Sequence, residues 1–104
     1  MTRTPIHPGE ILADELEERG LTCAELARAM QVPENRVSQI VAGKRKITAD
    51  TALRLSQCFG TSAELWTNLQ SAYELDLARS KAGDEIRRIP ALPIPDATAQ
   101  TTQP

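Results

Sequence analysis

A run of hydrogen-bonding side chains between residues 33 and 42 has the composition needed to recognise base pairs. In this segment Val37 and Ile40 share one face of an expected helix, and polar residues occupy the opposite face. Asn and Gln can pair with adenine, Arg with guanine, and Glu can accept from the cytosine amino group. The base-reading candidates are Glu34, Asn35, Arg36, Ser38 and Gln39. A solvated helix face has a similar composition, so the pattern alone leaves both interpretations open.

The charge distribution favours an anionic partner for the same part of the chain. The formal net charge is −2, yet residues 28–54 hold six basic side chains against two acidic ones. The basic residues are Arg28, Arg36, Lys44, Arg45, Lys46 and Arg54, and the acidic ones are Glu34 and Asp50. A concentrated basic segment in an acidic protein predicts binding to an anion at that segment. A solvated face of mixed charge is the alternative.

Two short helices must position these side chains. Thr22 and Glu25 have the spacing of a capping box and predict a helix over residues 22–30. Residues 31–33 predict a tight connection to a helix over residues 33–42 that ends at Gly43. Small Ala27 allows the two helices to cross closely, and Val32 fills the turn from inside. This arrangement is a helix-turn-helix.

Three further helices and two terminal segments complete the prediction. Pro8 begins a helix that Gly20 ends, and Thr48 caps one that Gly60 ends. A last helix runs from the cap at residues 61–64 to about residue 82. Its apolar stripe consists of Leu65, Trp66, Leu69, Ala72, Tyr73 and Leu77. The fold class is therefore all-α, a bundle of five helices over residues 8–82, with an N-terminal arm at residues 1–7 and a flexible, Pro/Thr-rich tail at residues 83–104.

The sequence offers little for catalysis or metal binding. Cys23 and Cys58 form no CxxC pair, and His7 is the only histidine, so no metal-ligand set, cofactor site or disulfide framework is expected. An enzyme is not expected, and a Cys–His nucleophilic pair is a remote alternative. No apolar run approaches the ~20 residues that span a bilayer. The first residues lack an apolar signal-peptide core, so we expect no membrane contact and a cytoplasmic location.

Several segments together resemble one family, the HigA antitoxins of the Cro/repressor-type helix-turn-helix class (the XRE superfamily). The similarity covers about residues 7–80. The matching segments are HPGEIL at 7–12, ELA at 25–27, VPENRVS at 32–38, ITADTALRL at 47–55, GTSAELW at 60–66 and NLQ at 68–70. The resemblance implies a repressor-like bundle that forms a homodimer and represses its own operon by binding operator DNA. It also implies neutralisation of a RelE-like toxin, HigB, which cleaves mRNA, and association with the nucleoid when bound to DNA.

The same resemblance implies roles for residues around the recognition helix. Arg36 is expected to reach either a guanine or a phosphate. Backbone phosphates are expected at Thr22 and Cys23, through the N-terminus of their helix, and at Lys44, Arg45 and Lys46 in the basic loop. Two residues depart from the usual pattern. Cys23 stands where many repressors have a Gln that contacts phosphate, and Glu34 repels phosphates unless it accepts from a cytosine.

Partner surfaces are less defined by the sequence. Trp66, Tyr73 and Leu77 are predicted at the dimer interface, with the monomer core as the alternative, especially for Trp66. No motif locates toxin binding, and the acidic residues Asp14, Glu17 and Glu18 are the electrostatic candidates for a basic RNA-cleaving partner. Two other functions remain open, a repressor of the same fold without a toxin partner and a protein-interaction module that no longer binds DNA. Arg87, Arg88 and Ile89 either touch a partner or form a frayed helix end, and the frayed end is favoured.

Overall fold

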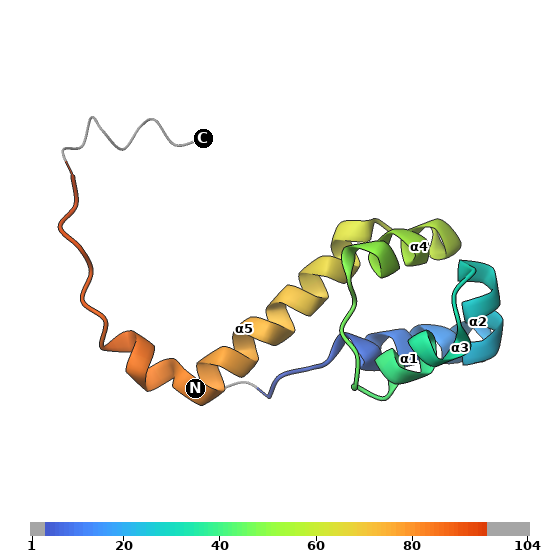
Figure 1. Cartoon of the computed structure of the whole chain (residues 1–104), viewed down its shortest axis with the longest axis horizontal. Helices are drawn as coiled ribbons and strands as arrows, with labels where there is room; N and C mark the ends of the chain where they lie inside the picture. The colour runs from blue at the N-terminus through green and yellow to red at the C-terminus, as the bar shows by residue number, and fades with distance from the viewer. Residues whose placement is uncertain (1–3, 96–104) are drawn as a thin grey trace.

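Five α-helices make up the fold, which we describe from a computed structural model covering residues 4–95 (Figure 1). The helices are α1 (Pro8–Arg19), α2 (Cys23–Met30), α3 (Glu34–Val41), α4 (Ala49–Phe59) and α5 (Ala63–Arg87). The described part of the chain contains no strand. The predicted all-α class and the order of five helices are therefore confirmed.

Local capping explains where most helices begin and end. Thr22 and Glu25 form the complete predicted capping box, and Thr48 caps α4 by accepting from the Thr51 N–H. Gly20 ends α1 in the left-handed region with φ 65°, a conformation that glycine adopts without strain. The third helix is slightly shorter than the predicted 33–42, because Pro33 is its N-cap and Ala42 its C-cap.

The core joins all five helices. Its buried residues are Leu12, Leu16, Leu26, Ala27, Met30, Val37, Ile40, Ile47, Ala52, Leu55 and Trp66. Ala27 is buried where α2 meets α3, and Val32 packs against the core from the turn, both as predicted. Trp66 is only 1% exposed, and its Nε1–H donates to Thr61 Oγ1 at 3.1 Å. Hydrophobic burial of these side chains contributes most of the free energy that holds α2 and α3 at a fixed angle.

The HPG motif at residues 7–9 packs α1 against α3. His7 Nδ1 accepts from the Gly9 N–H at 2.8 Å and caps α1, while the His7 ring meets Tyr73 edge-on at 4.8 Å. Pro8 and Gly9 are buried. A Cβ on Gly9 would lie 1.8 Å from the Ile40 carbonyl oxygen, so only glycine permits this approach. The predicted arm, residues 1–7, thus ends in a packed residue, and its residues 1–3 lie outside the described range.

Helix α5 differs from its prediction in length and in its exposed face. Ala82, the predicted end, has non-helical φ −133° and ψ 17°, but the helix resumes and continues to Arg87. Residues 83–87, predicted as the start of the tail, are therefore helical. The predicted apolar stripe is wrong at Leu65, which is 42% exposed, and Ala72 is also exposed. No helix within residues 4–95 is long and apolar enough to cross a membrane.

Candidate nucleic-acid interface

The helix-turn-helix consists of α2, α3 and a turn of three residues. Gln31 ends α2 with φ 60°, and its left-handed conformation reverses the chain. The Val32 N–H then donates to the Ala27 carbonyl at 3.0 Å, which holds the turn against α2. Because Val37 and Ile40 face the core, the opposite side of α3 is turned outward.

The five predicted base-reading residues all lie on α3, with different degrees of exposure. Glu34 and Asn35 are exposed in the first turn, while Arg36, Ser38 and Gln39 are half-buried. Ser38 Oγ donates to the Asn35 carbonyl at 3.4 Å. The structure therefore places the five residues on one short helix, and the base contacts themselves stay a prediction.

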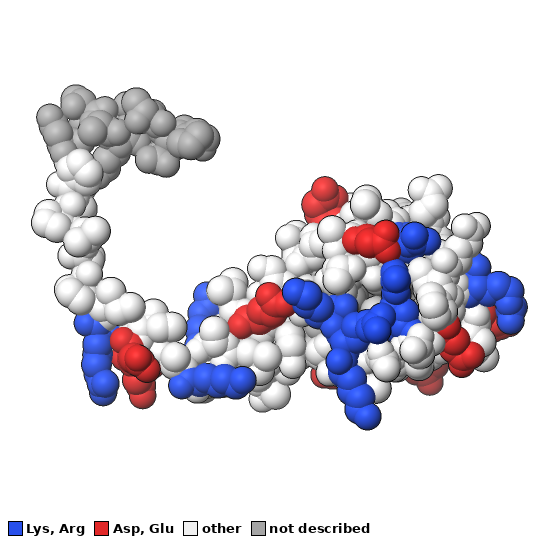
Figure 2. All heavy atoms as spheres, viewed as in Figure 1, with Lys and Arg blue, Asp and Glu red and all other residues white. Residues whose placement is uncertain are grey.

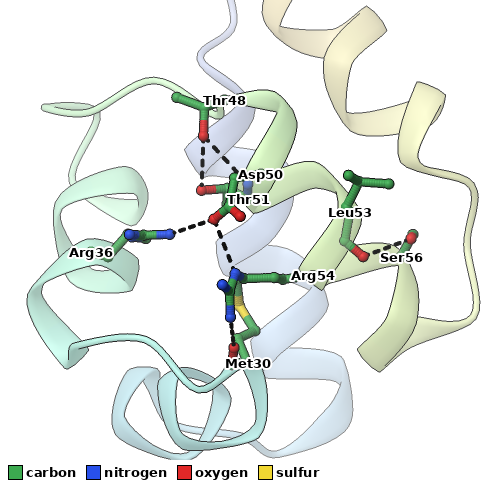
Figure 3. A network of polar contacts seen from close by, with 8 residues as sticks. All are labelled: Met30, Arg36, Thr48, Asp50, Thr51, Leu53, Arg54 and Ser56. Carbon is green, nitrogen blue, oxygen red and sulfur yellow. Dashed lines mark hydrogen bonds and ion pairs between the residues drawn. The ribbon is translucent and has the colours of Figure 1, made fainter.

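Arg36 is held by a polar network that joins α3 to α4 (Figure 3). Its Nη1 donates to Asp50 Oδ2 at 2.9 Å, and Arg54 Nε donates to the same oxygen at 3.0 Å. Arg54 also donates from Nη1 to the Met30 carbonyl at 2.8 Å, at the end of α2. Asp50 thus links all three helices of the candidate interface through two arginines.

The network lowers the pKa of Asp50. The hydrogen bond from Arg54 has the largest effect and that from Arg36 the next, because both guanidiniums stabilise the carboxylate. Asp50 and Arg54 were not predicted as site residues. Their i,i+4 spacing on a helix was the available signal, but nothing in the sequence pairs either of them with Arg36.

The basic loop, Lys44–Lys46, leads from α3 toward α4 and is exposed throughout. Lys and Arg side chains gather on the face shown in Figure 2, near the connection that Figure 1 draws between α3 and α4. A pocket of about 500 Å³ opens beside the loop. It is lined by Arg36, Arg45, Lys46, Thr48, Asp50, Thr51 and Arg54. The loop and the polar network therefore form one predominantly cationic surface.

Gln70 of α5 fixes the end of the basic loop. Its Oε1 accepts from the Ile47 N–H at 2.8 Å, in a buried environment, and its Nε2 donates to Glu74 at 3.0 Å. Gln70 was not predicted as a site residue. A lone Gln on a helix carries no local signal for a partner 23 residues earlier. The loop is thus anchored by the same helix that closes the core.

At the start of α2, the predicted phosphate contacts meet competing groups. Thr22 Oγ1 already accepts from the Glu25 N–H, and the Glu25 carboxylate accepts from the Thr22 N–H. Cys23 is half-buried and packs against the core. The Glu25 charge lies where a phosphate would approach, although the remaining N–H groups of the first turn still favour an anion. The roles of Thr22 and Cys23 stay predictions.

The predicted partner surfaces divide into buried and accessible residues. Trp66 is buried in the core, which favours the alternative given for it, and its role at a dimer interface stays a prediction. Tyr73 and Leu77 are half-buried and remain accessible in part. Asp14, Glu17 and Glu18 are exposed on α1. Within residues 4–95, no group of three His, Cys, Asp or Glu residues is arranged to hold a metal.

Comparisons with known proteins agree with this geometry. The model of the helix-turn-helix family matches residues 12–66. Virulence-associated protein I of Dichelobacter nodosus is 51% identical over 70% of this chain and 68% of its own, and antitoxin HigA-1 of Vibrio cholerae is 36% identical over 86% of each. The solved structure of the Pseudomonas aeruginosa antitoxin HigA with the higBA promoter superposes with a TM-score of 0.82 at 48% identity, covering 86% of this chain and 100% of that one.

Proposed function

The chain belongs to the helix-turn-helix family and, within it, to the HigA antitoxins, and we propose that it binds operator DNA as a homodimer, represses its own operon and neutralises a RelE-like HigB toxin. The observation that carries the DNA-binding part is the polar outer face of α3 beside a basic loop. The HigA structure solved with a promoter has the same fold. The resemblance to HigA antitoxins supports the toxin partner.

Base recognition is assigned to the outward side chains of α3. Asn35 and Gln39 lie four residues apart, so both side chains project from the same face. Each can form two hydrogen bonds with an adenine in the major groove, which discriminates against other bases by ~1–3 kcal/mol per pair. Glu34 accepts from a cytosine amino group or lies outside the contact. Arg36, fixed by Asp50, reaches a guanine or a phosphate beside it.

Affinity comes from the basic loop and from dimer formation. Lys44, Arg45 and Lys46 contact phosphates on each half-site, independently of the base sequence. Three cations give a modest affinity for one half-site. Two linked recognition helices about 34–36 Å apart would bind successive major grooves, and the second contact would form at a high effective concentration.

The toxin is assigned to the acidic surface of α1. Asp14, Glu17 and Glu18 are exposed, and in the sequence they are distant from the residues of the cationic surface. Their negative charges suit a basic RNA-cleaving partner. Charge reversal with Glu17→Lys and Glu18→Lys is expected to reduce neutralisation in a co-expression growth assay. Glu64→Lys and Glu85→Lys, both exposed on α5, provide the control with the same charge change. Growth protection equal to the control's would contradict this assignment.

The decisive experiment is a titration of the purified protein with its own upstream promoter fragment and with a scrambled duplex at two salt concentrations. The proposal expects a preference for the promoter and a steep loss of affinity at higher salt. Equal and weak binding to both duplexes would contradict operator recognition. A protein-interaction module would then be the better description of the two-helix unit.

A further inference from the structure

An extended apolar segment follows α5. Residues 89–95, here called the apolar segment, expose Ile89 by 68%, Leu92 by 86% and Ile94 by 79%. Prolines at positions 90, 93 and 95 prevent the segment from continuing the helix. Figure 1 draws it running away from the bundle. Three large aliphatic side chains exposed within six residues form an apolar surface that is more stable when covered.

The bundle carries an apolar groove of about 270 Å³ on another surface. Its lining residues come from the segment before α1, from α1 and from the middle of α5. They are Ile6, Ile11, Leu69, Ala72, Tyr73 and Asp76. The groove is mainly apolar and large enough for an aliphatic side chain, so its size and lining suit the residues of the apolar segment.

We propose that the apolar segment of one copy occupies the apolar groove of a second copy, and that the exchange is reciprocal. This inference rests on the homodimer of the proposed function and specifies its interface. A two-fold dimer allows both segments to be covered and both grooves to be filled by one symmetric contact. The partly accessible Tyr73 then belongs to the interface.

Chain length keeps Ile89 and Leu92 out of the groove of their own copy and brings only Ile94 to its edge. Tyr73 and Arg87 are 14 residues apart in α5, which would correspond to ~21 Å along a straight helix, although α5 is interrupted at Ala82. A fully extended chain from Arg88 to Ile94 spans only ~20–22 Å. A reversed segment would therefore bring Ile94 barely level with Tyr73, while Ile89 and Leu92 remained beside the outer part of α5. A second copy has no such restriction.

Charge is compatible with docking of the apolar segment in the groove of a second copy. Arg87 and Arg88 directly precede the apolar segment, and exposed Glu10 adjoins the groove residue Ile11 on α1. Arg87 is paired with Asp84, so Arg88 is the cation that a docked segment would present to the acidic residues of α1, and opposite charges favour association.

Disulfide trapping between two different variants tests the exchange. In a Cys23→Ala and Cys58→Ala background, one chain carries Ala72→Cys in the groove and a second, larger tagged chain carries Leu92→Cys. After mixing under mild oxidation, the proposal expects the mixed disulfide on a non-reducing gel. The control replaces Ala72→Cys by Ser71→Cys, because Ser71 is exposed on α5 but does not line the groove. It is expected to give at least about tenfold less product.

Sedimentation equilibrium separates failure of this inference from failure of the homodimer itself. A dimer that gives no mixed disulfide above the control overturns the exchange but leaves the homodimer standing. A monomer at all concentrations overturns both. A double variant, Ala72→Cys with Leu92→Cys, that forms only an internal disulfide also overturns the exchange, because its segment then reaches its own groove.

A non-covalent measurement keeps the test valid if the cysteine background does not fold. Leu92→Ser with Ile94→Ser in the otherwise natural chain is expected to raise the dimer dissociation constant at least about tenfold, since two buried aliphatic side chains are lost. Ala91→Ser, in the same segment, is the control and should change it less than about threefold. An unchanged constant in the double variant would overturn the proposal.

Discussion

Asp50 and Arg36, on two different helices, are joined by a 2.9 Å ion pair that fixes a side chain of the recognition helix from outside it. The same carboxylate oxygen accepts from Arg54, so Asp50 orients Arg36 without itself being suited to bind DNA. Its position within the cationic surface is thus explained by the arginines it orders.

Asp50→Asn is expected to separate affinity from selectivity. Loss of the negative charge strengthens binding to any duplex, while the freed Arg36 loses its fixed direction, so the ratio of operator to scrambled-duplex affinity falls. The titration at two salt concentrations measures both. Asp84→Asn makes the same charge change on α5, where Asp84 pairs with Arg87. An equal effect of both variants would mean that only net charge matters.

The Asp50 pair also predicts a pH dependence of stability. The folded-state pKa of Asp50 is lowered, so its contribution is complete above the unfolded value of about 3.9 and is lost as pH falls through the lower folded value. The stability difference between the natural chain and Asp50→Asn should therefore be constant from pH 5 to 7 and shrink below about pH 4. Urea unfolding at several pH values measures it, and a difference independent of pH would contradict the assignment.

Base reading by α3 is tested with Asn35→Ala combined with Gln39→Ala. The double variant should keep the fold, because Asn35 is exposed and Gln39 lies outside the core. Operator preference should drop about tenfold or more, while binding to a scrambled duplex stays nearly constant. Gln57→Ala, exposed on α4, serves as the control. Continued discrimination by the double variant would show that other residues read the bases.

Lys44→Ala should behave differently, because a phosphate contact carries no direct sequence information. We expect weaker binding to operator and scrambled duplex alike, and a slope of log affinity against log salt that is flatter by about one per copy. Lys81→Ala on α5 removes the same charge at an exposed site outside the cationic surface. A selective loss at the operator, or an unchanged slope, would argue for a solvated loop.

Gln70→Ala is expected to weaken both the fold and the loop. It removes the acceptor of the buried Ile47 N–H, and an unpaired buried donor costs about 1–3 kcal/mol. Urea unfolding measures this loss against the exposed Gln57→Ala control. Hydrogen exchange should also accelerate at Ile47 more than at α1. Unchanged stability would show that another group satisfies this N–H.

Gly9→Ala tests the close approach of α1 and α3. The added Cβ would meet the Ile40 carbonyl oxygen at 1.8 Å, and backbone on both sides must move, so a loss of about 2–3 kcal/mol is expected. Gly83→Ala is the matched control, because its Cβ would meet only the flexible end of Arg87, at 3.2 Å. Its effect should stay within about 1 kcal/mol. Similar unfolding curves for the two variants would contradict the packing argument.

Local signals predicted the elements, and long-range contacts account for what was missed. The Thr22–Glu25 capping box and the glycines at 20 and 60 act within a few residues, so helix limits followed from them. The contacts of Asp50 with Arg36 and of Gln70 with Ile47 depend on how helices cross. Periodicity could not predict them.

Helix α5 also shows that sequence periodicity does not predict which side chains are buried by packing against another helix. Its period of apolar residues placed Leu65 and Trp66 on one stripe, although neighbouring positions on a helix point about 100° apart. Packing against α4 buries Trp66 and leaves Leu65 exposed. The helical residues after Ala82 were not predicted, because a glycine such as Gly83 usually follows the end of a helix. The structure interrupts the helix at Ala82 but continues it to Arg87.

Because Trp66 is buried, its fluorescence reports whether the protein is folded. It is the only tryptophan of the chain, and its indole lies in the core with its N–H bonded to Thr61. Fluorescence emission should therefore be blue-shifted in the native state and move to the red when the bundle melts. Because Trp66 belongs to α5 and to the core rather than to the outer face of α3, a duplex added to the native protein should leave the emission wavelength unchanged. Unfolding can thus be followed without an attached dye, both with and without bound duplex.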